Sequence, residues 1–146
     1  MSNTVITPEE IRIFLMDTPE LNPLLRGIKF SPEEIDQASI HTIDYFNTIP
    51  PLTGMYTLES FPHRYLLLMG ATGHLLRSAS INQAINQLDY NVDGVQVNDY
   101  AKATLFSQLG TQFWQEFQQL AQNVKINQNI AAAFGSVGSE YKFRIR

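Results

Sequence analysis

The chain has no cysteine among its 146 residues. This absence excludes a disulfide framework, a thiolate nucleophile and every zinc site built on Cys ligands. It is consistent with a reducing compartment, where disulfides rarely persist. The length fits a single domain that is large enough to bury a core without covalent cross-links.

Long apolar runs are also missing. The most apolar stretch, residues 65–76, is about twelve residues long, whereas a helix needs about 20 residues to span a bilayer. The first residues, MSNTVITPEE, lack the basic region and the apolar segment of a signal peptide. We therefore expect a soluble protein that is made in the cytoplasm and has no membrane partner.

Positive charge is scarce except at the C-terminus. The formal net charge is −4, and residues 1–60 carry nine acidic and three basic side chains. Three of the ten Lys and Arg residues fall within the last five positions. No broad basic face is predicted, so we expect no specific nucleic-acid partner.

Recognisable catalytic motifs are absent as well. The three histidines, His41, His63 and His74, form no HExxH motif, and no serine lies in a GxSxG setting. His41 and Asp44 are one helical turn apart, but two groups do not make a metal site. The two Glu-Glu pairs sit where acidic side chains favour the first turn of a helix. We expect no catalytic residue, no cofactor and no metal, and hence no enzyme.

The residues that are present predict a mainly α fold. Thr7 with Glu10 and Ser31 with Glu34 form capping boxes, each with a proline at the first helical position. These signals predict one helix over residues 7–16 and a second one that begins at Ser31 and ends near Asn47, before a pair of prolines.

A third helix is predicted over residues 61–88. Its first half is apolar on all sides, which indicates burial. The small residues Gly70, Ala71 and Gly73 cluster within it, although glycine costs a helix roughly 1 kcal/mol relative to alanine. This cluster predicts that another helix backbone crosses here at close range.

Near residues 88–97, apolar and polar side chains alternate with a period of two, and this pattern replaces the helical one. The Asp-Gly pair between Val92 and Val95 favours a two-residue hairpin turn. Such a turn places Val92 opposite Val95 and Tyr90 opposite Val97. An isolated hairpin is only marginally stable, so this one is expected to pack against another element.

The last predicted helix runs from residue 98 or 99 to about residue 125. An apolar stripe with helical spacing faces the core, and the opposite face carries glutamines rather than Lys and Glu. Neutral amides cost less to bury at a subunit contact than charged groups do. We weigh a partner interface through Gln112, Gln115 and Gln119 evenly against a plain polar surface.

Residues 48–61 are expected to form an ordered loop. Two prolines and Gly54 interrupt helical structure there. The loop is nevertheless rich in apolar residues, among them Met55 and Tyr56, which is untypical of a free linker. We expect the loop to be pinned on the core or on a neighbouring chain, with Met55 and Tyr56 in a partner interface.

Residues 127–146 are predicted to form an extended or flexible C-terminal tail after a helical domain of residues 1–126. The last six alternate between apolar and basic side chains: Tyr141, Lys142, Phe143, Arg144, Ile145 and Arg146. In an extended chain the apolar side chains point one way and the cations the other. This pattern favours addition of a strand to a partner's sheet edge, with the cations facing an acidic rim. Binding of a single nucleic-acid strand and an incidental charged terminus are the alternatives.

In order along the chain, these pieces resemble the helical head-to-tail adaptor proteins of tailed bacteriophages. The resemblance covers most of residues 5–141. It rests on the TPEEIRIFL helix, the stretch NTIPPLTGMYTLESFPHRYLLLMGATGHLLRSA, the segment YNVDGVQVNDYAK, the FWQEFQQLAQNVK helix and the GSVGSEY tail. Its most specific parts are the PP…Y.LE.FP.RYLLL stretch and the DGV.V.D.AK junction from hairpin to helix.

This resemblance implies a virion structural protein without enzymatic activity. It implies a ring of twelve copies in the neck, at the head–tail interface, assembled from chains made in the host cytoplasm. It further implies that the C-terminal tail docks on the portal protein, while the other face meets a stopper or tail-terminator protein. The alternative interpretation is a cytosolic helical protein-binding or regulatory module that uses a groove lined by Trp114 and Tyr90.

Overall fold

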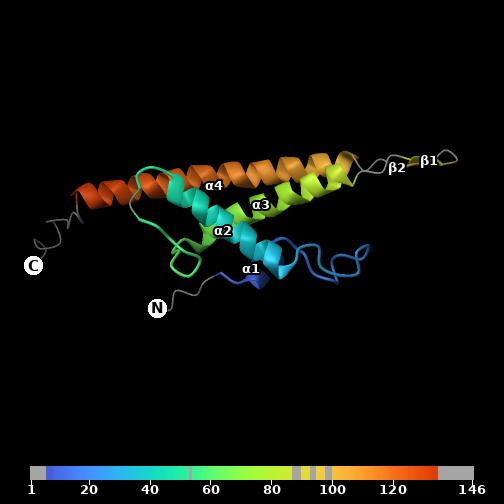
Figure 1. Cartoon of the computed structure of the whole chain (residues 1–146), viewed down its shortest axis with the longest axis horizontal. Helices are drawn as coiled ribbons and strands as arrows, with labels where there is room; N and C mark the ends of the chain where they lie inside the picture. The colour runs from blue at the N-terminus through green and yellow to red at the C-terminus, as the bar shows by residue number, and fades with distance from the viewer. Residues whose placement is uncertain (1–5, 53, 87–89, 93–94, 98–99, 135–146) are drawn as a thin grey trace, which may run out of the picture.

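The structure, a computed structural model, describes residues 6–52, 54–86, 90–92, 95–97 and 100–134. The packed body of these residues consists of four helices, as the expected mainly α class requires: α1 (Pro8–Phe14), α2 (Pro32–Thr48), α3 (Arg64–Ile85) and α4 (Tyr100–Phe134). Figure 1 shows an elongated molecule in which α4 runs along most of the length. Helix α3 lies beside α4, and α2 crosses them.

Helices α1 and α2 begin at the two predicted capping boxes. The Thr7 hydroxyl accepts a hydrogen bond from the Glu10 backbone N–H at 3.3 Å, and the Glu10 carboxylate accepts one from the Thr7 N–H at 3.3 Å. Ser31 and Glu34 repeat this exchange at 3.2 Å and 2.7 Å. Both predictions are confirmed. A cap of this kind typically contributes about 1 kcal/mol to helix stability, because it satisfies backbone N–H groups that the helix leaves unpaired.

The contact between α3 and α4 is the most extensive one between elements of the described structure. A Cβ atom added at Gly73 would lie 3.0 Å from the Trp114 backbone nitrogen. A Cβ atom added at Gly110 would lie 3.0 Å from the Arg77 backbone nitrogen. The two backbones therefore approach each other so closely that a larger residue at either position would force neighbouring atoms to shift. This confirms the close crossing that the small residues of α3 predict.

The core lies where α1, α2 and α4 pack on α3. Its largest fully buried apolar side chains come from all four helices: Ile11, Ile35, Phe46, Met69 and Phe117. Phe46 also meets Phe61 edge to face, with ring centroids 5.1 Å apart. This contact brings the end of the loop before α3 into the core.

A buried carboxylate fixes the chain between α1 and α2. Asp17 is only 4 % exposed and accepts hydrogen bonds from the backbone N–H groups of Lys29 at 2.7 Å and Phe30 at 2.9 Å. It also accepts one from the Asn22 side-chain amide at 2.6 Å. Arg12 lies 3.1 Å from the same carboxylate and donates to the Phe30 carbonyl oxygen at 2.7 Å. Residues 18–29 thus follow a defined path without a regular helix.

The expected fold class needs a correction at the hairpin, because no strand contributes to the packed body of the described residues. Strands β1 (Tyr90–Val92) and β2 (Val95–Val97) pair antiparallel, with Tyr90 opposite Val97. They are three residues each and lie beyond the ends of α3 and α4 in Figure 1. The described fold is therefore a helical assembly, not a bundle with a hairpin packed on it.

A second correction concerns the C-terminal end of the domain. Helix α4 extends to Phe134, so residues 127–134 are helical and not part of an extended tail. The physical reason lies in their composition, since they include three consecutive alanines, and alanine has the highest helix propensity of any residue. Residues 135–146 of the predicted tail lie outside the described residues.

Replacing Gly73 with alanine is expected to lower the free energy of unfolding by about 1 kcal/mol, the middle of the range that the cost of overpacking and the gain in helix propensity leave. Overpacking costs about 1–3 kcal/mol, and alanine regains about 1 kcal/mol of helix propensity. The new methyl group would meet backbone atoms of Trp114 and Gly110, which cannot move unless the helices separate. Chemical denaturation measures the change.

Gly54→Ala serves as the control for this substitution. A Cβ atom at Gly54 has no heavy atom within 4 Å, so its effect should stay below about 0.5 kcal/mol. Equal stability of the two variants would contradict the close approach of α3 and α4.

Candidate functional site

Helix α4 has an inner and an outer face, because its side chains repeat every 3.6 residues. On the inner face Phe117, Ala121 and Lys125 are completely buried. On the outer face Gln112, Gln115 and Gln119 are exposed. The three glutamines therefore lie together on one face, as the sequence predicts, whereas their role in a partner interface stays a prediction.

The same outer face continues into an apolar stripe near the C-terminal end of α4. Ile126 is 54 % exposed, Ile130 is 50 % exposed and Phe134 is 75 % exposed. Their spacing of four residues places them on successive turns of one side of the helix. Figure 1 shows this end of α4 extending past the other helices. We define the outer face of α4 by six residues: Gln112, Gln115, Gln119, Ile126, Ile130 and Phe134.

The apolar half of this face is absent from the sequence-based prediction. That prediction ends the helix near residue 125 and assigns all later residues to the tail. The sequence nevertheless contains a signal, since Ile126, Ile130 and Phe134 repeat every four residues around a run of three alanines. Helical spacing of this kind in an alanine-rich stretch indicates a continuing amphipathic helix.

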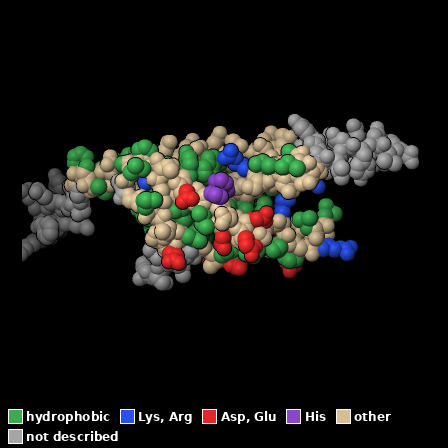
Figure 2. Space-filling view, viewed as in Figure 1, with side chains coloured by type: hydrophobic (Ala, Val, Ile, Leu, Met, Phe, Trp, Pro, Cys, Tyr) green, Lys and Arg blue, Asp and Glu red, His purple; other side chains and the backbone are tan. Residues whose placement is uncertain are grey.

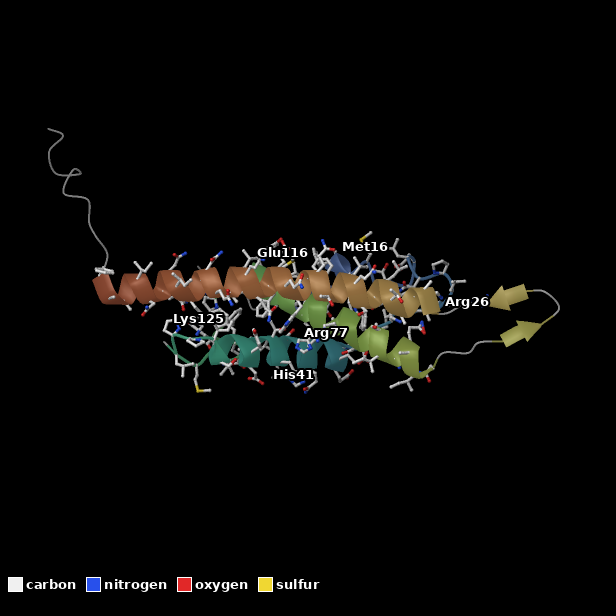
Figure 3. The ribbon with its side chains drawn as sticks, turned by 90° about the horizontal axis from the view of Figure 1, so that it is seen from above. Met16, Arg26, His41, Arg77, Glu116 and Lys125 are labelled. Atoms are coloured by element: carbon white, nitrogen blue, oxygen red, sulfur yellow. The ribbon has the colours of Figure 1, made fainter. Side chains whose placement is uncertain are left out.

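Lys125 anchors the inner side of α4 next to this stripe. Its Nζ atom lies 3.4 Å from the Pro51 carbonyl oxygen and 4.5 Å from the centre of the Phe46 ring. Burial lowers the pKa of Lys125, because the charged form loses water contacts. Figure 3 shows Lys125 between α4 and the end of α2, with Glu116 on the opposite side of α4.

The loop before α3 is pinned at Tyr56, as expected. The Asn47 side chain accepts a hydrogen bond from the Tyr56 N–H at 2.9 Å and donates one to the Tyr56 carbonyl oxygen at 2.9 Å. The Tyr56 hydroxyl lies 3.4 Å from the side-chain nitrogen of Gln128 in α4. Met55, by contrast, is 87 % exposed. Of the two loop residues predicted in an interface, Met55 is thus the accessible one.

Two of the histidines cluster with an aromatic side chain between the helices. The His74 ring lies 5.6 Å from the His41 ring and 4.9 Å from the Trp114 ring, measured between centroids. Burial lowers the pKa of His74, and the neighbouring charges of His41 and Arg77 lower it further. Burial also lowers the pKa of His63.

Within the described ranges, no group of three or more His, Cys, Asp and Glu side chains is placed to hold a metal ion. Nor does any helix in that part of the chain have the length and apolar character needed to cross a bilayer. The six predicted tail residues Tyr141–Arg146 lie outside the described residues.

No protein-family model, curated protein or solved structure matches the chain.

Lys125→Met is expected to preserve the fold and to alter how stability depends on pH. A lysine pKa that is lower in the folded state opposes folding while the group is charged. Stability should therefore rise as the pH increases from the folded-state pKa toward the unfolded value of about 10.5. The variant should lack this rise, and at neutral pH it should be at least as stable as the parent chain.

Urea denaturation at several pH values between 7 and about 10.5 measures this dependence. Gln122→Met, at an exposed position on the same helix, is the control and should retain the rise. A Lys125→Met variant that keeps the rise would show that another group causes it.

Proposed function

We propose that this chain is a head-to-tail adaptor of a tailed bacteriophage, a structural protein that forms a ring between the portal and the tail or stopper protein. The proposal begins from the resemblance of the sequence pieces along residues 5–141. The structural observation that carries it is the outer face of α4, which has the composition of a protein contact and no partner within the described chain.

The length of α4 supports a connecting role. Its 35 residues correspond to about 52 Å of helix. Long helices in globular proteins gain most of their stability from packing an apolar stripe. The inner face of α4 packs in this way, but the stripe of Ile126, Ile130 and Phe134 points away from the body. A second protein that covers this stripe would bury the apolar surface that the isolated chain leaves in water.

The composition of the outer face suits a permanent contact between proteins. Its glutamines need hydrogen-bond partners but carry no charge to neutralise, so their burial is less costly than that of Lys or Glu. Its apolar end supplies residues of the kind that anchor a helix in a partner's groove, one on each turn. Such a face fits an adaptor that has to hold two particle components together.

The alternative, a cytosolic helical binding or regulatory module, has weaker support. It requires a groove lined by Trp114 and Tyr90. Trp114 is instead packed between its neighbours, with ring centroids 5.0 Å from Tyr45 and 4.9 Å from Phe117. The side chain of Tyr90 lies outside the described residues.

The composition of the virus particle tests the proposal directly. Quantitative mass spectrometry of purified virions should find the chain at a copy number close to that of the portal protein. Electron microscopy should place its density between the head and the tail. Absence of the chain from purified particles would refute the proposal.

The apolar stripe should be required for attachment of the tail. Ile130→Glu combined with Phe134→Glu places two charges in the proposed contact, and each buried anchor of this kind is worth about 2 kcal/mol. We expect an infectious titre about 1000-fold lower, because a loss of about 4 kcal/mol corresponds to about three powers of ten in affinity. Heads without tails should accumulate in micrographs, while circular dichroism of the purified chain stays unchanged.

A matched control adds the same charges on the same turns. Asn129→Glu with Ala132→Glu changes exposed positions that point away from the stripe. This variant should keep its titre. If both double variants lose infectivity alike, the stripe is not the contact.

The terminal residues supply a separate test of docking on the portal. Removal of residues 141–146 should leave thermal unfolding unchanged and abolish the joining of heads and tails, because the proposed added strand is lost. The milder Arg144→Ala with Arg146→Ala should weaken attachment at low salt and make it less dependent on salt, because the charge-assisted contacts are lost. Infectious particles from the deletion mutant would refute strand addition by the tail.

A further inference from the structure

Residues 18–29, which we name the leucine segment, expose apolar side chains on a fixed backbone. Leu24 is 91 % exposed, Leu25 is 58 % exposed and Leu21 is 51 % exposed. The buried carboxylate of Asp17 holds the segment, through the Asn22 amide and the Lys29 backbone N–H. The leucines are therefore held at the surface by a buried hydrogen-bond network, although their exposure to water is unfavourable.

The leucine segment also forms an apolar pocket with a basic rim. A cavity of about 320 Å³ lies between the segment and α4. Its apolar lining includes Leu21, Leu24 and Phe106, and Lys102 stands at its edge. Arg26 is exposed on the same segment, where Glu20 is the only acidic side chain between residues 18 and 29. A partner for this pocket should offer an apolar side chain surrounded by carboxylates.

The exposed side of α2 has this chemistry. The helix contains four acidic residues and neither lysine nor arginine. Asp36 and Asp44 flank Ile40 at helical spacing, and Ile40 is 39 % exposed. We name Asp36, Ile40 and Asp44 the acidic face of α2. Figure 2 shows acidic side chains gathered over the region of α1 and α2, whereas the basic ones are scattered, several of them to the right of this group.

The two surfaces belong to different elements of one chain, the acidic face to α2 and the pocket to the leucine segment and α4. Figure 3 shows Arg26 of the leucine segment near the end of α4. Among the described residues, neither Asp36 nor Asp44 forms an ion pair with Arg26 or Lys102, so the two surfaces do not satisfy each other within one chain. They can join copies head to tail, and a contact of this type closes into a ring when the rotation between copies allows it.

We infer that the acidic face of α2 in one copy docks on the leucine segment of the next copy, with Ile40 in the pocket and Asp36 and Asp44 facing Arg26 and Lys102. This inference rests on the proposed function, since it names the surfaces through which the ring would form. The outer face of α4 takes no part in this contact and stays available to other particle components.

Charge reversal in two separate chains tests the pairing. The first chain carries Asp36→Lys and Asp44→Lys, so both of its surfaces are basic. The second carries Arg26→Glu and Lys102→Glu, so both of its surfaces are acidic. All four positions are exposed, so both chains should fold, which circular dichroism verifies. Each chain alone should self-associate at least tenfold more weakly than the parent, because like charges face each other.

An equal mixture of the two chains should associate with an affinity within about threefold of the parent chain, because each reversed surface can again meet an opposite charge. Sedimentation velocity of full-length protein at low salt measures all three cases. The matched control carries Gln115→Lys and Gln119→Lys on the outer face of α4 and should self-associate like the parent. Undiminished association of either reversed chain, a mixture that stays monomeric, or a parent chain that never self-associates would overturn the inference.

A second arm separates this inference from the proposed function. The chain has no cysteine, so Leu24→Cys and Ile40→Cys in one chain provide the only thiols. Oxidation should produce a ladder of disulfide-linked copies, whereas either single variant should give dimers at most. If no ladder forms but virions contain the chain, the inference fails and the proposed function stands. If the ladder forms but the chain is absent from virions, the proposed function fails and the paired surfaces of this inference stand.

Discussion

The close approach of α3 and α4 determines where every other part of the structure can lie. At Gly73 an added Cβ atom would meet only backbone atoms of α4, and at Gly110 it would meet the backbone and the side chain of Arg77 in α3. Such an approach maximises dispersion contacts along the pair and fixes the rotation of α4 about its own axis. Once that rotation is fixed, the 3.6-residue repeat decides which residues of α4 face inward. Phe117 and Lys125 therefore reach the core, and the glutamines of the outer face cannot.

The helices that complete the core pack on α3 and on the inner side of α4, so no described residue covers the outer side of α4. Phe46 illustrates the arrangement, since it lies between the Phe61 ring and the Lys125 ammonium group. The contact with Lys125 draws the end of α2 toward the inner side of α4, and the contact with Phe61 ties it to the loop before α3. The outer face is uncovered as a consequence of this packing, which is why it is the best candidate for a contact with another protein.

The features that could be predicted from the sequence are those with local causes. A capping box needs only residues three positions apart, and the cluster of small residues in α3 indicates a close neighbour without identifying it. The Asp17 network could not be predicted in this way, because its backbone partners lie 12 and 13 residues further along the chain.

The predicted end of α4 is wrong for another reason. Asparagine and alanine also suit a tail, and the four-residue spacing from Ile126 is the signal that favours a helix. The position of the paired strands likewise depends on tertiary packing, about which a turn signal carries no information.

Separate surfaces with different chemistry suit contacts of different kinds. The outer face of α4 consists of glutamines and an apolar stripe, with Glu116 as the one charged side chain of α4 exposed beside them, so its affinity should depend only weakly on salt. The leucine segment and the acidic face of α2 carry opposite charges, so their pairing should weaken as ionic strength rises. A chain that joins its own copies through a charged contact, and other components through a mainly uncharged one, can assemble in steps. Charged surfaces accelerate encounter between copies, whereas burial of apolar side chains slows dissociation. Under the connector role that we propose, this division places the more persistent contact on α4, which runs along most of the molecule.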